Sequence, residues 1–426
     1  MPHRVVITGL GPVTSAGIGK AAFYENLWEQ RVSPREIPAS FRQAHAFRSQ
    51  WYVPLPEVSL PEHGITLLHE HALQPEDRMV IVGTKLALED AGFRLTSQKN
   101  RMVIDGLDGP SAILGTGLSG MQTALESYLV HCVPPATLQA VFPNRRFGFN
   151  RMVVPKTMPN SPAAWASICF GLSGACTTLS ASCASGTYAI GEAFRRVRDG
   201  YDPVMLTGGV ESLREDFGFI MRGFDALGVL TQSPDGRPLP FGKHRSGFLF
   251  AEGGACLLVL EELEHARQRG APIYAEILDF RANSDASNLV QMDPEAKQII
   301  RLLAELSAGR KIDYLNTHGT GTVTNDAIEA RAIQTVFGDR ARQPLLNSTK
   351  GLLGHTLGAS GAIEAAVTAL ALSRGSIHGN RTEDPLENLN LPSDRVKAPL
   401  EHAISVSYGF GGHNGALLFK RYEPGA

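Results

Sequence analysis

Strand-length runs of β-branched and apolar residues alternate with longer helical patterns along most of this chain of 426 residues. That alternation is typical of α/β architecture, in which helices connect and cover the strands of a sheet. We expect strands at 5–8, 111–116, 175–181, 204–208, 255–260, 274–280, 312–316, 345–348, 404–407 and 416–419. We expect helices at 20–29, 78–91, 184–199, 294–308, 325–337 and 359–373. The length exceeds one ordinary core, which favours two domains or one large layered unit.

Boundary signals refine this outline. Asp293 and Pro294 are an N-cap and a favourable first residue, so they predict that the helix before Ala308 begins at 294. Proline-rich, aperiodic stretches at 35–76, 133–162 and 378–399 interrupt the alternation and predict long surface loops. The end of a helix near Gly270 suggests a division into halves at 1–270 and 271–426.

Composition excludes several classes of function. A hydrophobic content of 43% and a formal net charge of −2 describe a globular protein without the basic surface that nucleic acid or membrane binding needs. The first residues run directly into a strand, without the regions of a signal peptide, and no apolar run approaches the roughly 20 residues of a membrane-spanning helix. We therefore expect a cytoplasmic protein with no nucleic-acid or membrane partner.

The five cysteines do not form a disulfide or metal pattern. They are Cys132, Cys169, Cys176, Cys183 and Cys256, an odd number without a Cys-x-x-Cys pair. Cys169 and Cys176 are expected to be small buried hydrophobic residues. No phosphate loop, Gly-x-Ser-x-Gly motif or metal-spaced histidine pair is present, so we expect no metal and no cofactor.

Cys183 is the candidate nucleophile. It lies where the strand at 175–181 leads into the helix at 184–199, and small residues surround it. Unpaired amides and the helix dipole at a helix N-terminus favour the thiolate over the thiol. Most cysteines are packed core residues, however, and Cys183 taken alone does not decide between the two interpretations.

Two downstream histidines change that balance. His318 follows the strand at 312–316 and begins a Gly-Thr-Gly-Thr loop, at the end of a strand where open α/β sheets place ligands. His355 lies in a second glycine-rich run, with Lys350 before it and Glu364 after it. Two neutral imidazoles can each donate a hydrogen bond to a developing enolate oxygen, and a buried lysine and carboxylate can order them.

These motifs together resemble the β-ketoacyl-acyl-carrier-protein synthases, most closely the synthase II type of the thiolase superfamily. The resemblance rests on Cys183, the His318 loop, the segment from Lys350 to His355 and the closing run 406–415, with support from 4–11, 225–231, 245–254 and 284–286. It covers most of the chain. It implies a thiolase-like fold in which two similar halves form five αβαβα layers, usually as a homodimer or as a heterodimer with a related subunit.

The resemblance also implies roles. Cys183 would take an acyl group from the phosphopantetheine of an acyl carrier protein, and the carbanion from malonyl-carrier protein would attack that acyl-cysteine. His318 and His355 would stabilise the enolate, Lys350 and Glu364 would order the site, and the amides of Cys183 and Phe410 would form the oxyanion hole. Phe410 would also act as a gate. Thr320 and Thr322 would contact the pantetheine arm.

Further assignments are weaker or open. Leu118 and Met121 are candidates for the acyl pocket, with core packing as the alternative. Arg145, Arg146 and Arg151 could receive an acidic carrier protein or form a solvated cluster. Asp326 and Glu329 match supporting positions, or are an acidic pair at a helix N-terminus. The chain departs from the pattern at His413, which replaces a threonine, and at 286–294.

Two other functions compete with condensation. A chain-length-factor-like subunit would keep the fold and shape a heterodimer pocket, but such subunits characteristically lack the nucleophile that Cys183 provides. A thiolase would need a second catalytic cysteine near the C-terminus, and none follows Cys256. We therefore expect a decarboxylating acyltransferase of fatty acid, polyketide or polyene synthesis.

Overall fold

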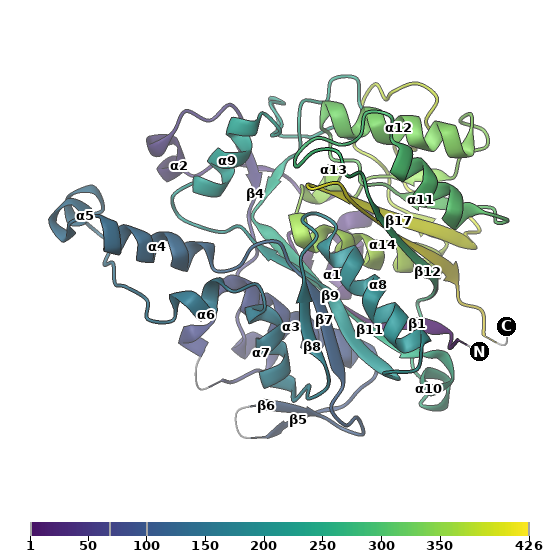
Figure 1. The fold of residues 1–426 in the computed structure, drawn as a ribbon, viewed down its shortest axis with the longest axis horizontal. Helices are drawn as coiled ribbons and strands as arrows, with labels where there is room; N and C mark the ends of the chain where they lie inside the picture. The colour runs from purple at the N-terminus through teal and green to yellow at the C-terminus, as the bar shows by residue number, and fades with distance from the viewer. Residues whose placement is uncertain (1, 68–69, 99–100, 425–426) are drawn as a thin grey trace.

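The computed structural model describes residues 2–67, 70–98 and 101–424, and it contains one arrangement of five strands twice (Figure 1). In the first half the sheet order is β8-β7-β9-β11-β1, and in the second it is β14-β13-β17-β18-β12. Numbered along the chain within its half, each set reads 3-2-4-5-1. The first set is β1 (Val5–Thr14), β7 (Ser111–Gly115), β8 (Cys176–Leu179), β9 (Val204–Ser212) and β11 (Gly253–Glu262). The second is β12 (Ala275–Ser284), β13 (Tyr314–Asn316), β14 (Leu345–Asn347), β17 (His402–Gly409) and β18 (His413–Arg421).

Strand directions repeat as well. In each half the two pairs that link the first, fifth and fourth strands are antiparallel, and the two pairs that link the fourth, second and third strands are parallel. The halves join where β1 pairs with β12 over Val5–Ile7, which makes one eleven-stranded sheet with the short β2 (Gly17–Ile18). Because the sheet is continuous, the division at 270 and 271 stays a prediction.

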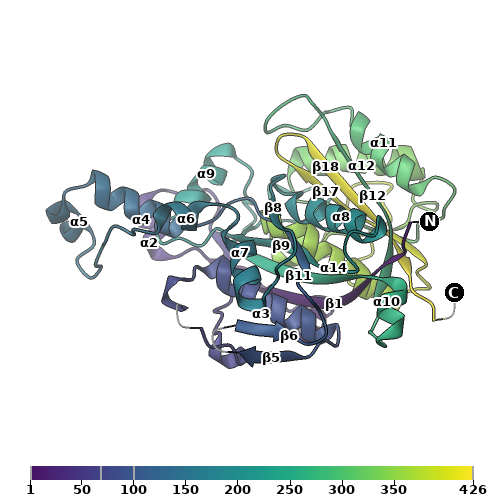
Figure 2. The same cartoon turned by 60° about the horizontal axis from the view of Figure 1, so that its bottom comes forward.

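Helices complete five layers, as Figures 1 and 2 show together. α8 (Ser185–Arg198) and α14 (Ser360–Arg374) lie in the middle, where both contact strands of both halves. α3 (Pro75–Asp90) and α7 (Ser161–Phe170) cover the outer face of the first half, and α11 (Lys297–Ser307) and α12 (Val323–Phe337) cover that of the second. The expected αβαβα layering of an α/β protein is confirmed.

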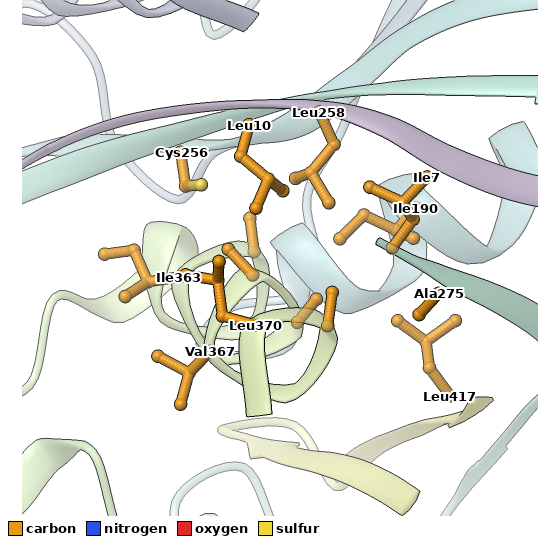
Figure 3. Close-up of a cluster of buried hydrophobic side chains, with 14 of the residues drawn as sticks. Ile7, Leu10, Ile190, Cys256, Leu258, Ala275, Ile363, Val367, Leu370 and Leu417 are labelled. Carbon is orange, nitrogen blue, oxygen red and sulfur yellow. The ribbon is translucent and has the colours of Figure 1, made fainter. Parts of the chain in front are cut away.

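The central layer is the main hydrophobic core (Figure 3). Ile190 of α8 and Ile363, Val367 and Leu370 of α14 pack with strand residues such as Leu258. α14 is buried along thirteen consecutive residues, 360–372, and five of these are alanines. A helix buried on every side needs apolar or small residues around its whole circumference.

An arm projects from the body beside the first half. It consists of α4 (Met121–Cys132), α5 (Pro135–Val141) and α6 (Val153–Thr157), which interrupt the connection from β7 to β8 (Figure 1). The other helices are α1 (Lys20–Trp28), α2 (Ala39–Ala44), α9 (Phe219–Leu227), α10 (Leu263–Gln268), α13 (Lys350–Leu353), and the short turns η1 (Pro61–His63), η2 (Glu70–Ala72) and η3 (Leu357–Ala359). The remaining short strands are β3 (Arg35–Glu36), β4 (Trp51–Val53), β5 (Leu95–Gln98), β6 (Arg101–Ile104), β10 (Phe250–Ala251), β15 (Ser376–Ile377) and β16 (Val396–Lys397).

All ten expected strands and all six expected helices are present, with two helix starts misplaced by three residues. α3 begins at Pro75, before the expected start at Arg78. α11 begins at Lys297 rather than Pro294, because Ala296 takes a left-handed φ of 54°. The carboxylate of Asp293 instead accepts hydrogen bonds from the amides of Glu295 and Lys297, so it holds a turn that precedes the helix. Across the described ranges, no helix is both long and apolar enough to cross a membrane.

One cysteine prediction was also wrong. Cys169 is buried, as expected, but Cys176 is exposed. The reason is topological: β8 is the last strand of the sheet, and the segment 173–177 around Cys176 is exposed to solvent.

Candidate active site

A tight turn between β8 and α8 presents Cys183. Ser182 takes a left-handed φ of 53°, which is uncommon for a residue other than glycine. The hydroxyl of Ser185 fastens the turn, because it donates to the carbonyl of Ser182 at 2.6 Å and accepts from the amide of Ala181 at 2.9 Å. The strand therefore stops abruptly, and Cys183 lies just before the first turn of α8.

A cavity of about 310 Å³ brings the distant sequence motifs together. Cys183, His318, His355 and Phe410 all line it. They come from the β8–α8 turn, the loop after β13, the loop after α13 and the β17–β18 turn. The clustering that the two histidines suggested is therefore present in the structure.

The surroundings of His355 determine its tautomer. Its Nδ1 accepts a hydrogen bond from the amide of Leu357 at 3.3 Å and lies 3.0 Å from the hydroxyl of Ser360. An amide can only donate, so Nδ1 carries no proton and the Nε2 of the neutral ring carries one. His355 can thus donate a hydrogen bond from Nε2. Its ring is edge-on to that of His318, with centroids 5.5 Å apart.

His318 is held through its backbone. The carboxylate of Glu329 accepts from the amides of His318 and Gly319, each at 2.8 Å. The ring lies 5.5 Å from that of Tyr408, and its Nδ1 has no hydrogen-bond partner within the described part of the chain. The loop is rigid and the side chain remains available to a substrate.

Both imidazoles are neutral. Burial and the nearby charge of Lys350 lower the pKa of His318 and of His355 well below the ordinary value. A neutral imidazole can donate one hydrogen bond and leave its other nitrogen as an acceptor. The rings therefore suit stabilisation of an anion that forms during a reaction, because they add no fixed charge beforehand.

Lys350 and Glu364 form a buried ion pair beside the histidines. Both side chains are 2% exposed, and the Nζ of Lys350 donates to the Oε1 of Glu364. Burial raises the pKa of Glu364 to about 7, although the charge of Lys350 and the hydrogen bond to it act in the opposite direction. Lys350 carries the positive charge that lowers the pKa of both imidazoles.

The state of the thiol differs from the expectation. Burial raises the pKa of Cys183 to about 11, and this outweighs the charge of Lys350 and the hydrogen bonds from Ser182 and from the amide of Phe410. The thiol of the empty site is therefore protonated at neutral pH. The sequence indicated the helix N-terminus, but it could not indicate that the sulfur is buried.

The amide of Phe410 and two threonines also face the cavity. The amide of Phe410 points at the sulfur of Cys183, and the left-handed Gly411 and Gly412 complete that turn. Thr320 and Thr322 line the cavity, with their hydroxyls 2.9 Å apart. This arrangement fits the roles that the resemblance implied.

Asp326 and Glu329 are buried supports rather than a solvated helix end. Asp326 accepts hydrogen bonds from the amides of Gly321 and Phe241, and Glu329 holds the His318 loop. Both are fully buried, and burial raises the pKa of Glu329 to about 8. They fix the loop that carries His318, Thr320 and Thr322.

Several predicted residues lie outside the cavity. Leu118 and Met121 do not line it; Met121 packs instead into the neighbouring cluster to which Leu357 also belongs. Arg145 pairs with Glu126 and Asp216, while Arg146 and Arg151 are exposed. The acyl-pocket and docking assignments of these residues stay predictions.

The departures from the family pattern are close to the site. Val290, Gln291 and Met292 of the unmatched stretch line the cavity wall. The ring of His413 lies against Gly411, and its centroid is 6.3 Å from that of Tyr188. The stretch 290–292 therefore lies in the cavity wall, whereas His413 lies next to the glycine turn after Phe410.

Sequence reasoning missed Glu211, Phe248 and Tyr408. Phe248 and Tyr408 line the cavity, and the ring of Phe248 is edge-on to that of His355 at 5.2 Å. Glu211 is fully buried and contributes to the electrostatics of Cys183. A buried strand that ends in a glutamate was the only signal for Glu211, and it was too weak to single the residue out.

Comparisons with known proteins agree with this geometry. Residues 3–266 match the N-terminal domain of β-ketoacyl synthases, and residues 274–382 match their C-terminal domain. The chain is 30% identical over 99% of its length to 3-oxoacyl-[acyl-carrier-protein] synthase 1 of Escherichia coli K12, covering 99% of it. It is 31% identical to a putative polyketide β-ketoacyl synthase 1 of Streptomyces halstedii, over 98% of each chain.

A solved structure shares the whole fold. It is a type II polyketide ketosynthase bound to a hexaketide and in complex with its acyl-carrier protein, with a TM-score of 0.81 and 25% identity. The match covers 99% of this chain and 100% of that one. The chain belongs to the β-ketoacyl synthase family, and its fold is that of the thiolase-like ketosynthases.

Proposed function

We propose that the chain is a 3-oxoacyl-[acyl-carrier-protein] synthase, an acyltransferase that joins an acyl group to malonyl-carrier protein with loss of carbon dioxide. The observation that carries the proposal is the opening of Cys183, His318 and His355 into one cavity. The family supports condensation over the chain-length-factor alternative, and the chain retains the nucleophile. The reaction needs no metal or redox group, because each step is a transfer of an acyl group or a proton.

Acyl transfer to Cys183 is the first step. The sulfur attacks the carbonyl carbon of an acyl thioester, the carrier's thiolate leaves, and the proton of Cys183 passes to that thiolate. The tetrahedral oxygen accepts hydrogen bonds from the amides of Cys183 and Phe410. Because burial keeps the thiol of Cys183 protonated, its proton is transferred during the reaction with the thioester, and the sulfur carries no buried charge before that step.

Condensation is the second step. Malonyl thioester loses its carboxylate as carbon dioxide, and the electron pair forms an enolate whose oxygen accepts hydrogen bonds from His318 and His355. The enolate carbon then attacks the acyl-cysteine carbonyl, a carbon–carbon bond forms and the Cys183 thiolate leaves. The neutral state of both rings supports this assignment, since a donor without charge stabilises the enolate without attracting the malonyl carboxylate beforehand.

We propose that the carrier protein docks near the cavity mouth. The relative that was solved with its acyl-carrier protein supports such a partner. Exposed apolar side chains rim the mouth, namely Leu227, Val290 and Val323. Arg146 and Arg151 remain the candidate basic contacts, whereas Arg145 is already paired. Reversing the charge of both should weaken carrier binding, and an unchanged affinity would contradict the docking role.

We also propose a dimer, formed by pairing of two copies of β8. This strand has a neighbour on one side only, and the amides of Cys176 and Thr178 alternate with those that bond β7, so they face the open edge. Exposed Tyr128, Met158 and Ile168 lie on nearby elements. Cys176→Pro should convert a dimer into a monomer in light scattering. A wild-type chain that is already monomeric would point to a heterodimer with a related subunit.

A cytoplasmic location is part of the proposal. The described cysteines are all free, which suits a reducing compartment. Fractionation of cells that express a tagged full-length chain would test it.

The two half-reactions test the function. Wild-type protein is incubated with an acyl-carrier protein, and the acyl group on Cys183 is located by mass spectrometry of peptides. Malonyl-carrier protein is then added, and the β-ketoacyl product and carbon dioxide are measured. We expect both steps with one acyl group for each chain. An acyl-enzyme that releases no β-ketoacyl product would contradict condensation.

A further inference from the structure

Glu211 is a buried carboxylate that the two-step reaction leaves without a role. It lies near the end of β9 and is fully buried. Its Oε1 accepts from the amide of Leu118 at 2.7 Å, and its Oε2 accepts from the amides of Gly117 and Gly358 at 2.9 and 3.0 Å. The carboxyl group of Glu211 and these three amides form a junction that fixes the backbone at Gly117, Leu118 and Gly358.

The junction joins the two halves of the molecule. Gly117 and Leu118 follow β7 in the first half, whereas Gly358 belongs to η3 in the second. A Cβ at either glycine would lie only 2.6 Å from the Oε2 of Glu211. The carboxyl group of Glu211 can therefore lie this close only because both positions are glycine. Any side chain at either position would collide with it.

The junction also controls His355. Gly358 follows Leu357, whose amide donates to the Nδ1 of His355. Leu357 takes a left-handed φ of 46°, a strained conformation for a non-glycine residue that persists only where neighbours hold it. The hydrogen bond from Gly358 to Glu211 is one such restraint, and the side chain of Leu357 forms part of the cavity wall.

The nucleophile helix is packed against the same turn. The carbonyl oxygen of Gly358 would lie 3.1 Å from a Cβ at Gly186 of α8 and 2.8 Å from one at Gly209 of β9. The backbone of η3 is therefore in close contact with α8 and β9 through the carbonyl of Gly358, while Glu211 holds the amide of the same residue.

We propose that Glu211 is a positioning residue for condensation: it holds the turn after His355 against the Leu118 loop, and so keeps the Nε2 of His355 aimed at the enolate oxygen. The inference rests on the proposed function. Acyl transfer to Cys183 relies on the Cys183 and Phe410 amides and does not need His355 in this position. Loss of Glu211 should therefore slow the second half-reaction much more than the first.

Glu211→Gln is the test, and Glu76→Gln is its matched control. Glu76 is another buried acidic residue, in the first turn of α3, and it accepts from the hydroxyl of Ser119 and the amide of Gly120 on the same loop after β7. No hydrogen bond joins it to η3 among the described residues. Glutamine keeps the shape of Glu211 but places an NH2 group against an amide donor. We expect Glu211→Gln to slow condensation about tenfold to hundredfold and acylation less than about threefold. In Glu76→Gln the ratio of the two rates should stay that of the wild type.

A second readout does not depend on turnover. The charge of Glu211 is among the causes that raise the pKa of Cys183, so alkylation of Cys183 by iodoacetamide should reach its half-maximal rate at a lower pH in Glu211→Gln. Glu76→Gln should show the wild-type pH profile. A purely structural role of Glu211 would not move this midpoint.

Each outcome decides. A folded Glu211→Gln that condenses at the wild-type rate, or that loses both half-reactions equally, overturns the proposal. If Glu211→Gln does not fold, Glu211→Asp replaces it: the charge stays, the shorter side chain cannot reach both Gly117 and Gly358, and only condensation should fall. A wild-type enzyme that acylates but never condenses would instead overturn the proposed function, while the alkylation profile would still report on Glu211.

Discussion

The two halves share one strand order but contribute different chemistry. In the first half, the connection after its third strand, β8, carries Cys183 directly into α8. In the second half, the connection after its third strand, β14, passes through α13 and η3 and carries His355 before α14. The loop after the second strand holds Leu118 in one half and His318 in the other. In the proposed reaction, one copy of the repeated scaffold supplies the nucleophile and the other supplies the hydrogen-bond donors for the enolate.

The loops after the second strands are held alike but from different elements. In the second half, Glu329 of α12 accepts from the amides of His318 and Gly319. In the first half, Glu211 of β9 accepts from the amides of Gly117 and Leu118. Both side chains are fully buried, and each accepts hydrogen bonds from two successive amides of its loop, which fixes the loop backbone. Only the anchor in the first half also reaches across to the other half.

Removal of the proposed nucleophile in the first half should have the largest effect on activity. Cys183→Ala should abolish covalent acylation, since no other described cysteine lines the cavity. Peptide mass spectrometry after incubation with acyl-carrier protein measures it. Cys176→Ala is the control, because that cysteine is exposed on the strand leading to the same turn. Acylation that survives in Cys183→Ala would show that the nucleophile lies elsewhere.

The histidines of the second half should separate the two steps. In His318→Ala and His355→Ala, condensation should fall by about 10²- to 10⁴-fold, the range for one positioned proton donor, while acylation changes far less. Single-turnover rates of each half-reaction provide the measurement. Equal losses in both steps would break the proposed division between the halves.

Removal of one partner of the ion pair between Lys350 and Glu364 should lower the stability of the fold. Lys350→Met leaves the buried carboxylate of Glu364 unpaired, which costs roughly 3–5 kcal/mol when it is charged. Lys350→Met with Glu364→Gln should regain much of that loss in denaturant unfolding. A double variant as unstable as the single one would mean that packing, not charge, is responsible.

The stability of Lys350→Met should depend on pH, and the raised pKa of Glu364 gives the direction. The folded-state pKa of Glu364 is raised above its unfolded value, so the carboxyl is easier to bury when protonated. The stability that this raised pKa contributes to folding is therefore fully present below the unfolded pKa of about 4.3. It is lost as the pH rises to the folded pKa. Without Lys350 that folded pKa is higher still. Lys350→Met should thus be more destabilised at pH 9 than at pH 6, and the reverse order would contradict the assignment.

The anchor in the second half should have the smallest effect. Glu329→Gln leaves one amide of the His318 loop facing an NH2 group, which costs about 1–3 kcal/mol. Thermal unfolding measures this, with Glu305→Gln on the surface of α11 as the control. A neutral Glu329→Gln would mean that the anchors of the two halves are not comparable.

Local patterns predicted the elements, and motif order predicted the family. The apolar runs found every strand of the two sets, because a buried strand imposes that composition on its own residues. The misplaced start of α11 depends on one left-handed residue, Ala296, that no periodicity reveals. The exposure of Cys176 depends on the position of β8 at the edge of the sheet, which is a property of the whole topology.

The sequence predicted those site residues that lie in short, recognisable motifs. Cys183, His318 and His355 lie in distinctive glycine-rich runs. Glu211 acts through residues about a hundred positions away on one side and nearly one hundred and fifty on the other, so nothing near it in the chain indicates its partners. The protonated thiol likewise follows from complete burial, which outweighs the helix N-terminus that the sequence displays.

The burial of α14 on all sides has a practical result for anyone who divides this protein. Its thirteen consecutive buried residues lie against strands of both halves. A fragment that ends near residue 270 would therefore expose the apolar strand surface that α14 covers. The complementary fragment would expose the apolar side of α14 that normally packs on those strands. Neither fragment should persist alone. Co-expressed, they should reassemble and regain acylation, which makes the junction between the halves a natural place for a split reporter.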